Sequence, residues 1–568
     1  MPEGQSKATR RRRHPGGGGR KRRFESKGRQ VEAEALGEVR ALLGDGERRR
    51  DLLIEYLHLI QDRYSHLGHR HLAALAAELR LPMAEVYETA TFYAHFDVIR
   101  EGAEAPPALT VRVCDGLSCA LAGAEDLLAA LPDALGTDVR VLRAPCVGRC
   151  DRAPVAKVGK NAVALATIET VRAAVSAGAT TPMTQPFIDF DAYRAAGGYR
   201  LLSDCLDGKV EVESLITTLE DSGLRGLGGA GFPTGRKWRF VLAEPGPRLM
   251  ALNADEGEPG TFKDRHFLET DPHRVLEGML VAAWAVQAEA AYIYLRDEYP
   301  HVRDILLTEL PKLEAAGLTR AGAVHLRRGA GAYICGEESA MLESIEGKRG
   351  LPRHKPPFPA QVGLFGRPTL IHNVETLYWL RDIVDKGAQW YADQGINGAK
   401  GMHAFSVSGR VNEPGVKIAP AGITARQLID DHCGGMAPGH EFKAYLPGGA
   451  SGGMLPASMA DIPLDFGTLE EHGCFIGSSA LIVLSDRDNM RDAALNLVRF
   501  FEDESCGQCT PCRAGCEKAA VLMTEPVWDA GLLRELSQAM ADASICGLGQ
   551  AAPNPILSVL KHFPEEVS

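Results

Sequence analysis

The sequence lacks any apolar run of about 18 residues, the length that a membrane-spanning helix requires. It also lacks a signal peptide, because the basic N-terminal segment is not followed by an apolar one. We find no internal repeat. These absences predict a cytoplasmic protein. Its 568 residues, 45% of them hydrophobic, are enough for about three to five packed domains.

Acidic residues are scarce in the first 30 residues, which hold eleven Lys and Arg against Glu3 and Glu25, a net charge of +9. The whole chain has a net charge of −11, so the remainder carries −20. A segment this basic and glycine-rich cannot bury a core, and we expect residues 1–30 to be disordered. Such arms can bind nucleic acid, but no aromatic or groove-reading motif accompanies this one. The pattern favours a solvated tail or a tether to an acidic partner, without nucleic acid.

Thirteen cysteines in a chain of this size favour metal ligands over a disulfide framework. Nine of them fall into two spaced sets. The first set is Cys114-x4-Cys119 with Cys146-x3-Cys150; the second is Cys506-x2-Cys509-x2-Cys512 with the remote Cys546, and Cys516 lies one turn beyond the triplet. Each set supplies four thiolates, the number that an iron–sulfur cluster needs.

The spacing within each set discriminates between clusters and zinc. A C-x2-C-x2-C triplet with a distant fourth ligand is typical of [4Fe–4S] sites, whereas zinc more usually takes two separated C-x2-C pairs. The N-terminal spacing is not that of plant-type ferredoxins, so zinc stays open there, with a cluster favoured. Cys516 is expected to face the core. Buried structural thiols are expected at Cys205, Cys335, Cys433 and Cys474.

Hydrophobic periodicity divides the chain into regions. Helical spacing covers 33–43, 50–64, 72–79 and 83–93. Alternation predicts strands at 109–113 and 139–142, each running toward a cysteine, then a hairpin of 155–158 and 161–165 and, between the cysteine pairs, a helix over 120–131. The predicted domains are a basic arm (1–30), a helical bundle (31–105), a small α/β domain (106–175), a linker (176–195), a larger α/β domain (196–400), a β-rich module (401–470) and a helical domain (471–568).

Two glycine-rich loops lie in the larger α/β domain. Gly226-Leu-Gly-Gly-Ala-Gly231 satisfies G-x-G-x-x-G, but it follows a predicted helix rather than a strand, which argues against a Rossmann site. Its backbone N–H groups can approach a phosphate or a flat ring, and Lys237 can neutralise phosphate charge; a structural turn is the alternative. The second loop, 328–336, precedes a predicted helix that begins with Glu337 and Glu338, and capping that helix needs only one of them.

Two polar segments accompany these loops. Arg349, Arg353, Lys355 and Phe358 suit the phosphates and adenine of a nucleotide. The segment Asn253-Ala-Asp-Glu-Gly-Glu-Pro-Gly260 reads as a solvated loop on composition alone. A site that binds nucleotide hydroxyls or flavin ring edges also needs such carboxylates and amides.

These motifs resemble those of a known family. Residues 196–568 resemble the NADH-oxidising flavoprotein subunit of respiratory complex I, and residues 31–175 resemble its small [2Fe–2S] partner subunit. The resemblance rests on segments 226–238, 253–265, 329–338, 355–359, 373–376, 505–513 and 544–546, and on Ala90-Thr-Phe-Tyr93 with the N-terminal cysteine spacing. It implies an α/β multidomain fold: a helical bundle, a thioredoxin-like [2Fe–2S] domain, an FMN- and NADH-binding domain, a ubiquitin-like β-rich module and a helical [4Fe–4S] domain.

The resemblance also implies ligands by position. FMN would be held by Gly226, Gly228, Gly229, Gly231, Lys237, Asn253, Asp255, Glu256, Asn373 and Thr376, and NAD by Phe232, Phe240, Glu258, Glu338, Lys355 and Phe358. The [2Fe–2S] ligands would be Cys114, Cys119, Cys146 and Cys150, and the [4Fe–4S] ligands Cys506, Cys509, Cys512 and Cys546. No catalytic acid or base is implied, because the hydride is transferred at FMN, which then exchanges single electrons with clusters.

Two positions depart from the complex I pattern: Leu227 stands where Arg is usual, and His372 where Asn is usual. With the fusion of two subunits in one chain, they favour the diaphorase (beta) subunits of soluble NAD-linked formate dehydrogenases and NAD-reducing hydrogenases. In the hydrogenase relatives the N-terminal cluster ligands are often incomplete, whereas all four are present here, which favours formate dehydrogenase over hydrogenase. The diaphorase of a hydrogenase and a complex I-type NADH dehydrogenase subunit are the alternatives. The resemblance then implies a molybdenum or tungsten partner subunit with further clusters, because no segment here resembles a metal–pterin site.

Overall fold

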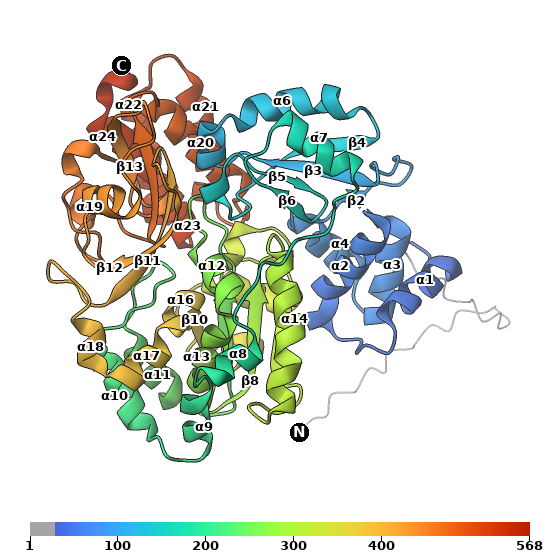
Figure 1. Cartoon of the computed structure of the whole chain (residues 1–568). Coiled ribbons are helices and arrows are strands. Elements are labelled where there is room, and N and C mark those ends of the chain that lie inside the picture. Colours follow the sequence, from blue (N-terminus) through green and yellow to red (C-terminus); the bar gives the residue numbers. More distant parts are fainter. Residues whose placement is uncertain (1–28) are drawn as a thin grey trace, which may run out of the picture.

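The computed structural model describes residues 29–568, so the expectation of a disordered arm falls almost wholly outside the described residues (Figure 1). The first unit is the expected helical bundle. Its elements are α1 (Ala33–Leu43), η1 (Arg50–Leu52), α2 (Leu53–Tyr64), α3 (His69–Leu79) and α4 (Met83–Phe92), with a short parallel pair, β1 (Leu67–Gly68) and β2 (Val98–Ile99). Within residues 29–568, every helix is too short or too polar to cross a membrane.

A small α/β domain follows the bundle. Its sheet has the order β4-β3-β5-β6, in which β3 (Leu109–Cys114) and β4 (Val139–Ala144) are parallel. The expected hairpin is confirmed as β5 (Ala156–Val158) and β6 (Asn161–Val163). The helix expected at 120–131 is instead two helices, α5 (Leu117–Leu121) and α6 (Ala124–Leu135), because Gly123 takes a left-handed φ of 88° between them. The domain ends with α7 (Ile168–Ser176).

The larger α/β domain is built on a four-stranded parallel sheet with the order β10-β7-β8-β9. Its strands are β7 (Arg248–Ala254), β8 (Ala288–Leu295), β9 (Val324–Arg328) and β10 (Thr369–Asn373). Both faces are covered, which explains the near-continuous apolar runs of β7 and β8. The domain's helices are α8 (Phe190–Ala195), α9 (Arg200–Leu206), α10 (Val212–Ser222), α11 (Thr234–Ala243), α12 (Lys263–Thr270), α13 (Pro272–Ala285), α14 (Pro300–Ala315), α15 (Glu338–Ile345), α16 (Val374–Tyr378), α17 (Leu380–Lys386) and α18 (Ala388–Ala392).

The β-rich module is a mixed five-stranded sheet with the order β12-β11-β15-β13-β14. Its strands are β11 (Met402–Gly409), β12 (Gly415–Pro420), β13 (Phe442–Leu446), β14 (Leu455–Pro456) and β15 (Ala480–Ser485). We expected the module to end at residue 470, but the central strand is β15, so the sheet continues to residue 485. All six residues of β15 are buried, and a short apolar run of this kind does not distinguish a core strand from a buried helix.

The chain ends in the expected helical domain. Its elements are α20 (Met490–Asp503), α21 (Thr510–Thr524), α22 (Ala530–Ala543), α23 (Gly547–Ala551) and α24 (Asn554–His562). Helix α20 returns to the small α/β domain, as Figure 1 shows, and packs against α5. Asn496 of α20 donates to the carbonyl of Asp115 over 2.9 Å, so two domains that are far apart in the sequence meet here.

The packing of α13 gives a test of the fold. A Cβ on Gly278 would lie 2.2 Å from the Leu377 carbonyl oxygen, whereas one on Gly37 of α1 would meet nothing within 4 Å. We expect Gly278→Ala to lower the free energy of unfolding by about 1–3 kcal/mol through overpacking. Gly37→Ala should raise it by about 0.5–1 kcal/mol through helix propensity. Urea unfolding followed by circular dichroism measures both, and equal shifts would contradict the α13–α16 packing.

Candidate functional site

The candidate site lies at the carboxyl edge of the parallel sheet, where β7 and β10 end side by side. Asn253 and Asn373, the expected amides, occupy paired positions on these strands. Asn253 Nδ2 donates to the Gly336 carbonyl over 2.9 Å, and Asn373 Nδ2 donates to Asp264 over 2.6 Å. The carboxyl edge of a parallel sheet is the usual ligand-binding position in α/β folds. Here it gathers three segments that are far apart in the sequence.

The first glycine loop lies directly over this edge. A Cβ on Gly228 would lie 3.0 Å from Asn373 Cβ, and one on Gly231, whose φ is 63°, would lie 2.6 Å from the Phe466 ring. The backbone N–H of Leu227 donates to Thr376 Oγ1 over 2.9 Å. Helix α10 precedes the loop and α11 follows it, so the structure confirms that this is not a Rossmann loop. It is a cradle of exposed backbone whose shape side chains would fill.

Asp255 carries the clearest sign of a missing ligand. Its Oδ2 is buried and has no hydrogen-bond partner among the described residues. Burial raises the pKa of this carboxyl well above its ordinary value. A buried polar atom without a partner is costly unless a ligand or water satisfies it. Together with the glycine cradle, this orphaned oxygen fits the hydroxyl-rich chain of a flavin nucleotide.

Glu256 and Glu258, the other expected acids of this segment, lie in different surroundings. Glu256 accepts from the backbone N–H groups of Asp264 and Arg265 at 2.7 and 3.1 Å, and burial raises its pKa. Its carboxylate therefore caps the start of α12. Glu258 accepts from the backbone N–H of Ser451 over 2.8 Å, and burial raises its pKa to about 7.

A buried ion pair, which the sequence did not reveal, contacts the first glycine loop from the protein interior. Lys263 Nζ lies 2.5 Å from Glu375 and donates to the Leu227 carbonyl over 3.0 Å. Burial lowers the pKa of Lys263, but Asp264 and Glu375 outweigh it and raise the pKa above its ordinary value. Both residues lie in segments that carry the family resemblance, 253–265 and 373–376. This is the only feature of the sequence that could have pointed to the pair.

An ionic cluster lines the other side of the site. Glu337 caps α15 by accepting from the N–H groups of Ser339 and Ala340, which frees Glu338. Glu338 lies 2.8 Å from Lys355 and 3.8 Å from Lys237. Burial raises the pKa of Glu338, but the two ammonium groups outweigh it and hold the pKa below its ordinary value. Glu338 is therefore an ionised acceptor at neutral pH.

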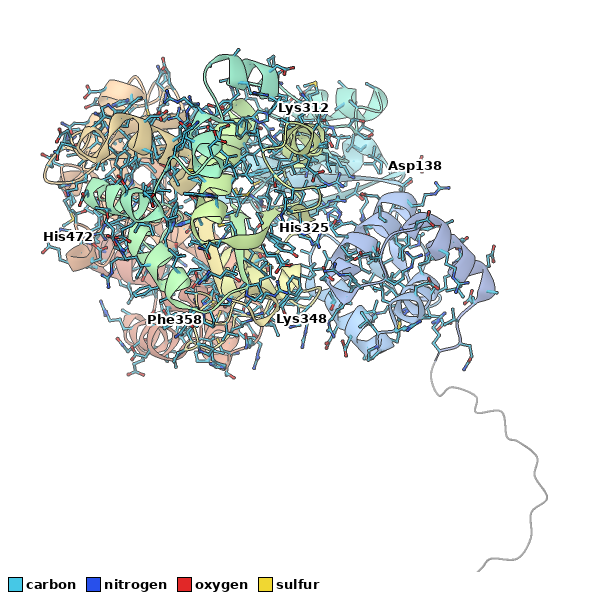
Figure 2. The ribbon with its side chains drawn as sticks, turned by 90° about the horizontal axis from the view of Figure 1, so that it is seen from below. Asp138, Lys312, His325, Lys348, Phe358 and His472 are labelled. Carbon is cyan, nitrogen blue, oxygen red and sulfur yellow. The ribbon has the colours of Figure 1, made fainter. Side chains whose placement is uncertain are left out.

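Exposed aromatic rings border the site. Phe232, Phe240 and Phe358 are 37%, 49% and 52% exposed, and Phe358 appears at the molecular surface in Figure 2. The rings of Phe232 and Phe240 lie 6.0 Å apart, and Arg236, which sequence reasoning missed, lies over both. Exposed rings beside charged side chains favour stacking with a planar ligand.

The N-terminal cysteines converge, as their spacing predicts. Cys114 ends β3, Cys119 lies in α5, Cys146 lies in the loop after β4, and Cys150 begins the short helix η2 (Cys150–Arg152). All four are buried, Cys146 Sγ lies 3.4 Å from Cys150 Sγ, and Cys114 interacts with both Cys119 and Cys146. The set fits a four-thiolate metal centre.

The C-terminal cysteines gather at helix N-termini. Cys509 precedes α21, Cys546 precedes α23, and the nearby Cys506 and Cys512 complete the set. Helix N-termini stabilise negative charge, which suits thiolates and the clusters that they bind. Cys506, Cys509 and Cys546 are only partly buried. Burial is confirmed for the remaining cysteines, which are Cys205, Cys335, Cys433, Cys474 and the core-facing Cys516.

The loop of the small α/β domain that follows β4 and carries Cys146 (the cysteine loop) is hydrogen-bonded to residues of the candidate site (the flavin-type site). The buried Arg296 donates to the carbonyls of Cys146, over 2.7 Å, and of Glu256. Arg265 donates to the Gly148 carbonyl over 2.7 Å, and Tyr299 donates to the Glu256 carboxylate over 2.9 Å. The contacts to the cysteine loop join segments more than 100 residues apart, and no local pattern announces them.

Three family models match the chain. Residues 39–178 match a thioredoxin-like [2Fe-2S] ferredoxin, residues 219–382 the Nuo51 FMN-binding domain, and residues 492–568 the NADH-ubiquinone oxidoreductase-F iron-sulfur binding region. These matches confirm the expected fold class and the FMN, [2Fe–2S] and [4Fe–4S] modules.

Individual relatives extend over most of the chain. A subunit of NADH-quinone oxidoreductase from Rhizobium meliloti is 41% identical over 396 residues, which are 66% of this chain and 92% of the relative. The mitochondrial NADH dehydrogenase [ubiquinone] flavoprotein 1 of Dictyostelium discoideum is 42% identical over 373 residues, which are 62% of this chain and 78% of that protein. A chain in the crystal structure of an air-oxidised NAD+-reducing [NiFe]-hydrogenase is 30% identical, with a TM-score of 0.80 over 92% of this chain and 94% of that one.

The geometry and the similarities agree. A glycine cradle at the sheet edge, an ionic cluster beside it and two four-cysteine sets lie in one polypeptide. The chain belongs to the family of FMN-binding, iron–sulfur flavoproteins of the NADH-quinone oxidoreductases, and it carries the thioredoxin-like [2Fe–2S] domain in the same polypeptide.

Proposed function

We propose that this chain is the diaphorase subunit of an NAD-dependent formate dehydrogenase. In this role it passes electrons between the clusters of a partner subunit and NAD+ through bound FMN. The observation that carries the diaphorase part is the orphaned Asp255 carboxyl at the sheet edge over which the first glycine loop lies. Segments beside this carboxyl reach both cysteine sets. On one side Arg296 bridges Glu256 and Cys146. On the other, Glu337 lies close enough to Cys546 to help burial raise the pKa of that thiol, to about 11.

The residues around the cradle would divide the binding of FMN. Gly226, Gly228, Gly229 and Gly231 allow the backbone to approach the flavin, and Lys237 supplies positive charge to its phosphate. Asn253, Asp255, Asn373 and Thr376 offer amide, carboxyl and hydroxyl groups at the carboxyl edge of the sheet, and Glu256 holds the α12 end of the segment in place. Bound FMN would supply the conversion between hydride and single-electron transfer.

NADH would bind across the aromatic and ionic border of the same site. Phe232, Phe240 and Phe358 offer ring faces to the nicotinamide and adenine. Lys355 offers charge to the diphosphate, and Glu258 offers hydrogen-bond acceptors. The ionised Glu338 suits a pair of ribose hydroxyls and disfavours a 2′-phosphate. No side chain needs to exchange a proton during hydride transfer, so the chain contributes positioning.

The cysteine sets would hold different clusters: Cys114, Cys119, Cys146 and Cys150 a [2Fe–2S] cluster, and Cys506, Cys509, Cys512 and Cys546 a [4Fe–4S] cluster. The first set is buried, whereas Cys506, Cys509 and Cys546 of the second are partly exposed. The second set is therefore the better exit toward a partner subunit that carries further clusters.

The identity of the partner distinguishes two versions of this function. The complete N-terminal ligand set supports formate dehydrogenase, in which the partner would carry molybdenum or tungsten. The alternative is the diaphorase of an NAD-reducing hydrogenase, which the 30% identity to the hydrogenase chain over both modules favours. Purification of the native complex, followed by elemental analysis of its large subunit, decides between them. Molybdenum or tungsten with formate-dependent NAD+ reduction is the expected result, and nickel with hydrogen-dependent reduction would contradict it.

Glu338→Gln tests nucleotide discrimination. Loss of the charge should relax the preference for NADH over NADPH by roughly 1–3 kcal/mol, because one charge-assisted hydrogen bond and one repulsion disappear. The ratio of kcat/KM values for the two nucleotides, with ferricyanide as acceptor, measures it. Glu337→Gln is the matched control: it removes the neighbouring carboxylate, which caps α15 and also lies 2.9 Å from Lys355, and it should leave the ratio unchanged. Equal ratios in the wild type and Glu338→Gln would exclude this role.

Cys509→Ser tests the second cluster. It should remove the [4Fe–4S] signal from the reduced protein's EPR spectrum and abolish electron flow to the partner. NADH-to-ferricyanide activity should persist, because small dyes take electrons at the flavin. Cys433→Ser, at a buried cysteine of the β-rich module, should retain both the signal and the electron flow. The wild type should contain about six irons per chain, four plus two; zinc in place of iron would contradict the assignment.

A further inference from the structure

The second glycine loop has almost no side chains with which to hold its own shape. Residues 329–332 read Gly-Ala-Gly-Ala, and Gly331 has a left-handed φ of 73°. Glycine-rich backbone is conformationally permissive, so a single loop geometry requires contacts from outside. The loop leads into Gly336, whose carbonyl accepts from Asn253, and into Glu337 and Glu338 of α15. Its position therefore sets one wall of the nucleotide site.

One face of α2, in the N-terminal bundle, contacts the start of this loop. Glu55, His58 and Asp62 are spaced by three and four residues and so share a helical face. Glu55 Oε1 accepts from the Arg328 backbone N–H over 2.8 Å, and Asp62 accepts from the Arg328 guanidinium over 2.8 Å. His58 Nε2 lies 2.8 Å from the Gly329 carbonyl. The first two residues of the loop segment are thereby held by side chains of another domain.

The segment after α4 holds the next two loop residues. The backbone N–H groups of Ala94 and His95 donate to the carbonyls of Gly331 and Ala330 over 3.2 and 3.1 Å. A Cβ on Gly331 would lie 3.3 Å from the His95 nitrogen, so the two backbones are in close contact. Four consecutive residues, 328–331, are thus hydrogen-bonded to the bundle.

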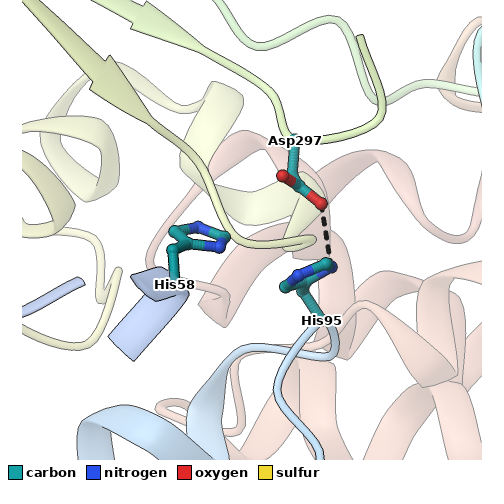
Figure 3. A group of neighbouring side chains, drawn as sticks. All are labelled: His58, His95 and Asp297. Carbon is teal, nitrogen blue, oxygen red and sulfur yellow. Dashed lines mark ion pairs between the residues drawn. The ribbon is translucent and has the colours of Figure 1, made fainter. Parts of the chain in front are cut away.

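Figure 3 shows the side-chain cluster at the centre of this contact, His58, His95 and Asp297. A carbonyl can only accept, so His58 Nε2 carries the proton that it donates to Gly329. His95 Nδ1 lies 2.8 Å from Asp297, which also pairs with the Arg328 guanidinium. Burial, and next the charge of Arg328, hold the pKa of His58 well below its ordinary value. His58 is therefore a neutral donor with a fixed tautomer.

The charges around the cluster favour a positioning role over a metal site. His58 Nδ1 and His95 Nε2 are buried without a hydrogen-bond partner among the described residues. In a metal site, these two nitrogens would bind the metal while the opposite ring nitrogens keep their hydrogen bonds. Asp297, however, is already paired with Arg328 and His95. A divalent cation here would lie beside the buried guanidinium of Arg328, and the two nearby carboxylates, Asp297 and Asp62, are already paired with that guanidinium.

We propose that His58, with His95 and Asp297 behind it, is a positioning residue for NADH, through which the N-terminal bundle fixes loop 329–336 in its nucleotide-binding shape. The inference rests on the proposed NADH site. On this proposal, the N-terminal [2Fe–2S] module has a second role besides holding a cluster. Its helical bundle holds loop 329–336 of the flavin domain in the shape that binds NADH.

The test compares His58→Leu, which removes the donor to Gly329, with His58→Gln, whose amide nitrogen lies the same number of bonds from the backbone. In full-length protein with FMN and iron content measured, His58→Leu should raise the KM for NADH about tenfold, the loss expected for one buried hydrogen bond, and leave kcat with ferricyanide within about twofold. His58→Gln should restore the KM to within about twofold of the wild type. Hydrogen–deuterium exchange of amides 329–336 should rise in His58→Leu alone.

His71 of α3 provides the matched control. It is as buried as His58, is bonded through Nε2 to Glu38 inside the bundle and has an unpartnered Nδ1, but its bonded partner belongs to the bundle. His71→Leu should destabilise the bundle without changing the KM for NADH. Should His58→Leu fail to fold, Glu55→Gln weakens the neighbouring contact to Arg328 and should raise the KM about two- to fivefold.

Several results would overturn the proposal. An unchanged KM in a folded His58→Leu, or in Glu55→Gln where that variant stands in, excludes the positioning role, as does an equal rise in His71→Leu. One zinc per wild-type chain that is lost in both His58→Gln and His95→Asn assigns the cluster to a metal instead. A wild type that binds no FMN or does not oxidise NADH defeats the proposed function itself, and this outcome is distinct from the other three.

Discussion

The buried guanidinium of Arg296 joins the flavin-type site to the cysteine loop of the small α/β domain. It donates to the carbonyls of Glu256 and Cys146 and pairs with Glu298 at 3.2 Å. A charge at 4% exposure is tolerated only when its hydrogen bonds and counter-charge are in place. Loss of any partner would leave a buried charge or carbonyl unsatisfied. The relative position of the two modules is therefore fixed by polar contacts that cannot be exchanged for water.

The nucleotide site illustrates a general consequence of building with glycine. Loops 226–231 and 329–332 expose backbone because they have almost no side chains, and for the same reason they cannot fix themselves. The first loop is held by Thr376 and Lys263 from below. The second is held by α2 and the segment after α4. The backbone of each loop can approach a ligand closely because side chains from other segments of the structure hold the loop in place.

The electrostatics divide the site into two halves. On the side of Asp255, Glu256 and Glu258, burial raises the pKa of each carboxyl, to about 7 for Glu258. On the opposite side the lysines keep Glu338 ionised. The difference follows from the neighbours: Lys355 and Lys237 lie beside Glu338, whereas burial dominates at the first three acids.

The sequence by itself determined the chemistry of this protein. Cysteine spacing indicated two four-thiolate centres, helical periodicity placed α1 to α4, and the G-x-G-x-x-G context correctly argued against a Rossmann loop. These inferences succeeded because ligand spacing and hydrophobic period are local. The tertiary structure alone decided that β15 completes the β-rich sheet, that Arg296 bridges the two modules and that His58 contacts Gly329, 271 residues away. Such contacts depend on how separately folded units pack, and the residues that make them have no local spacing by which they could be recognised.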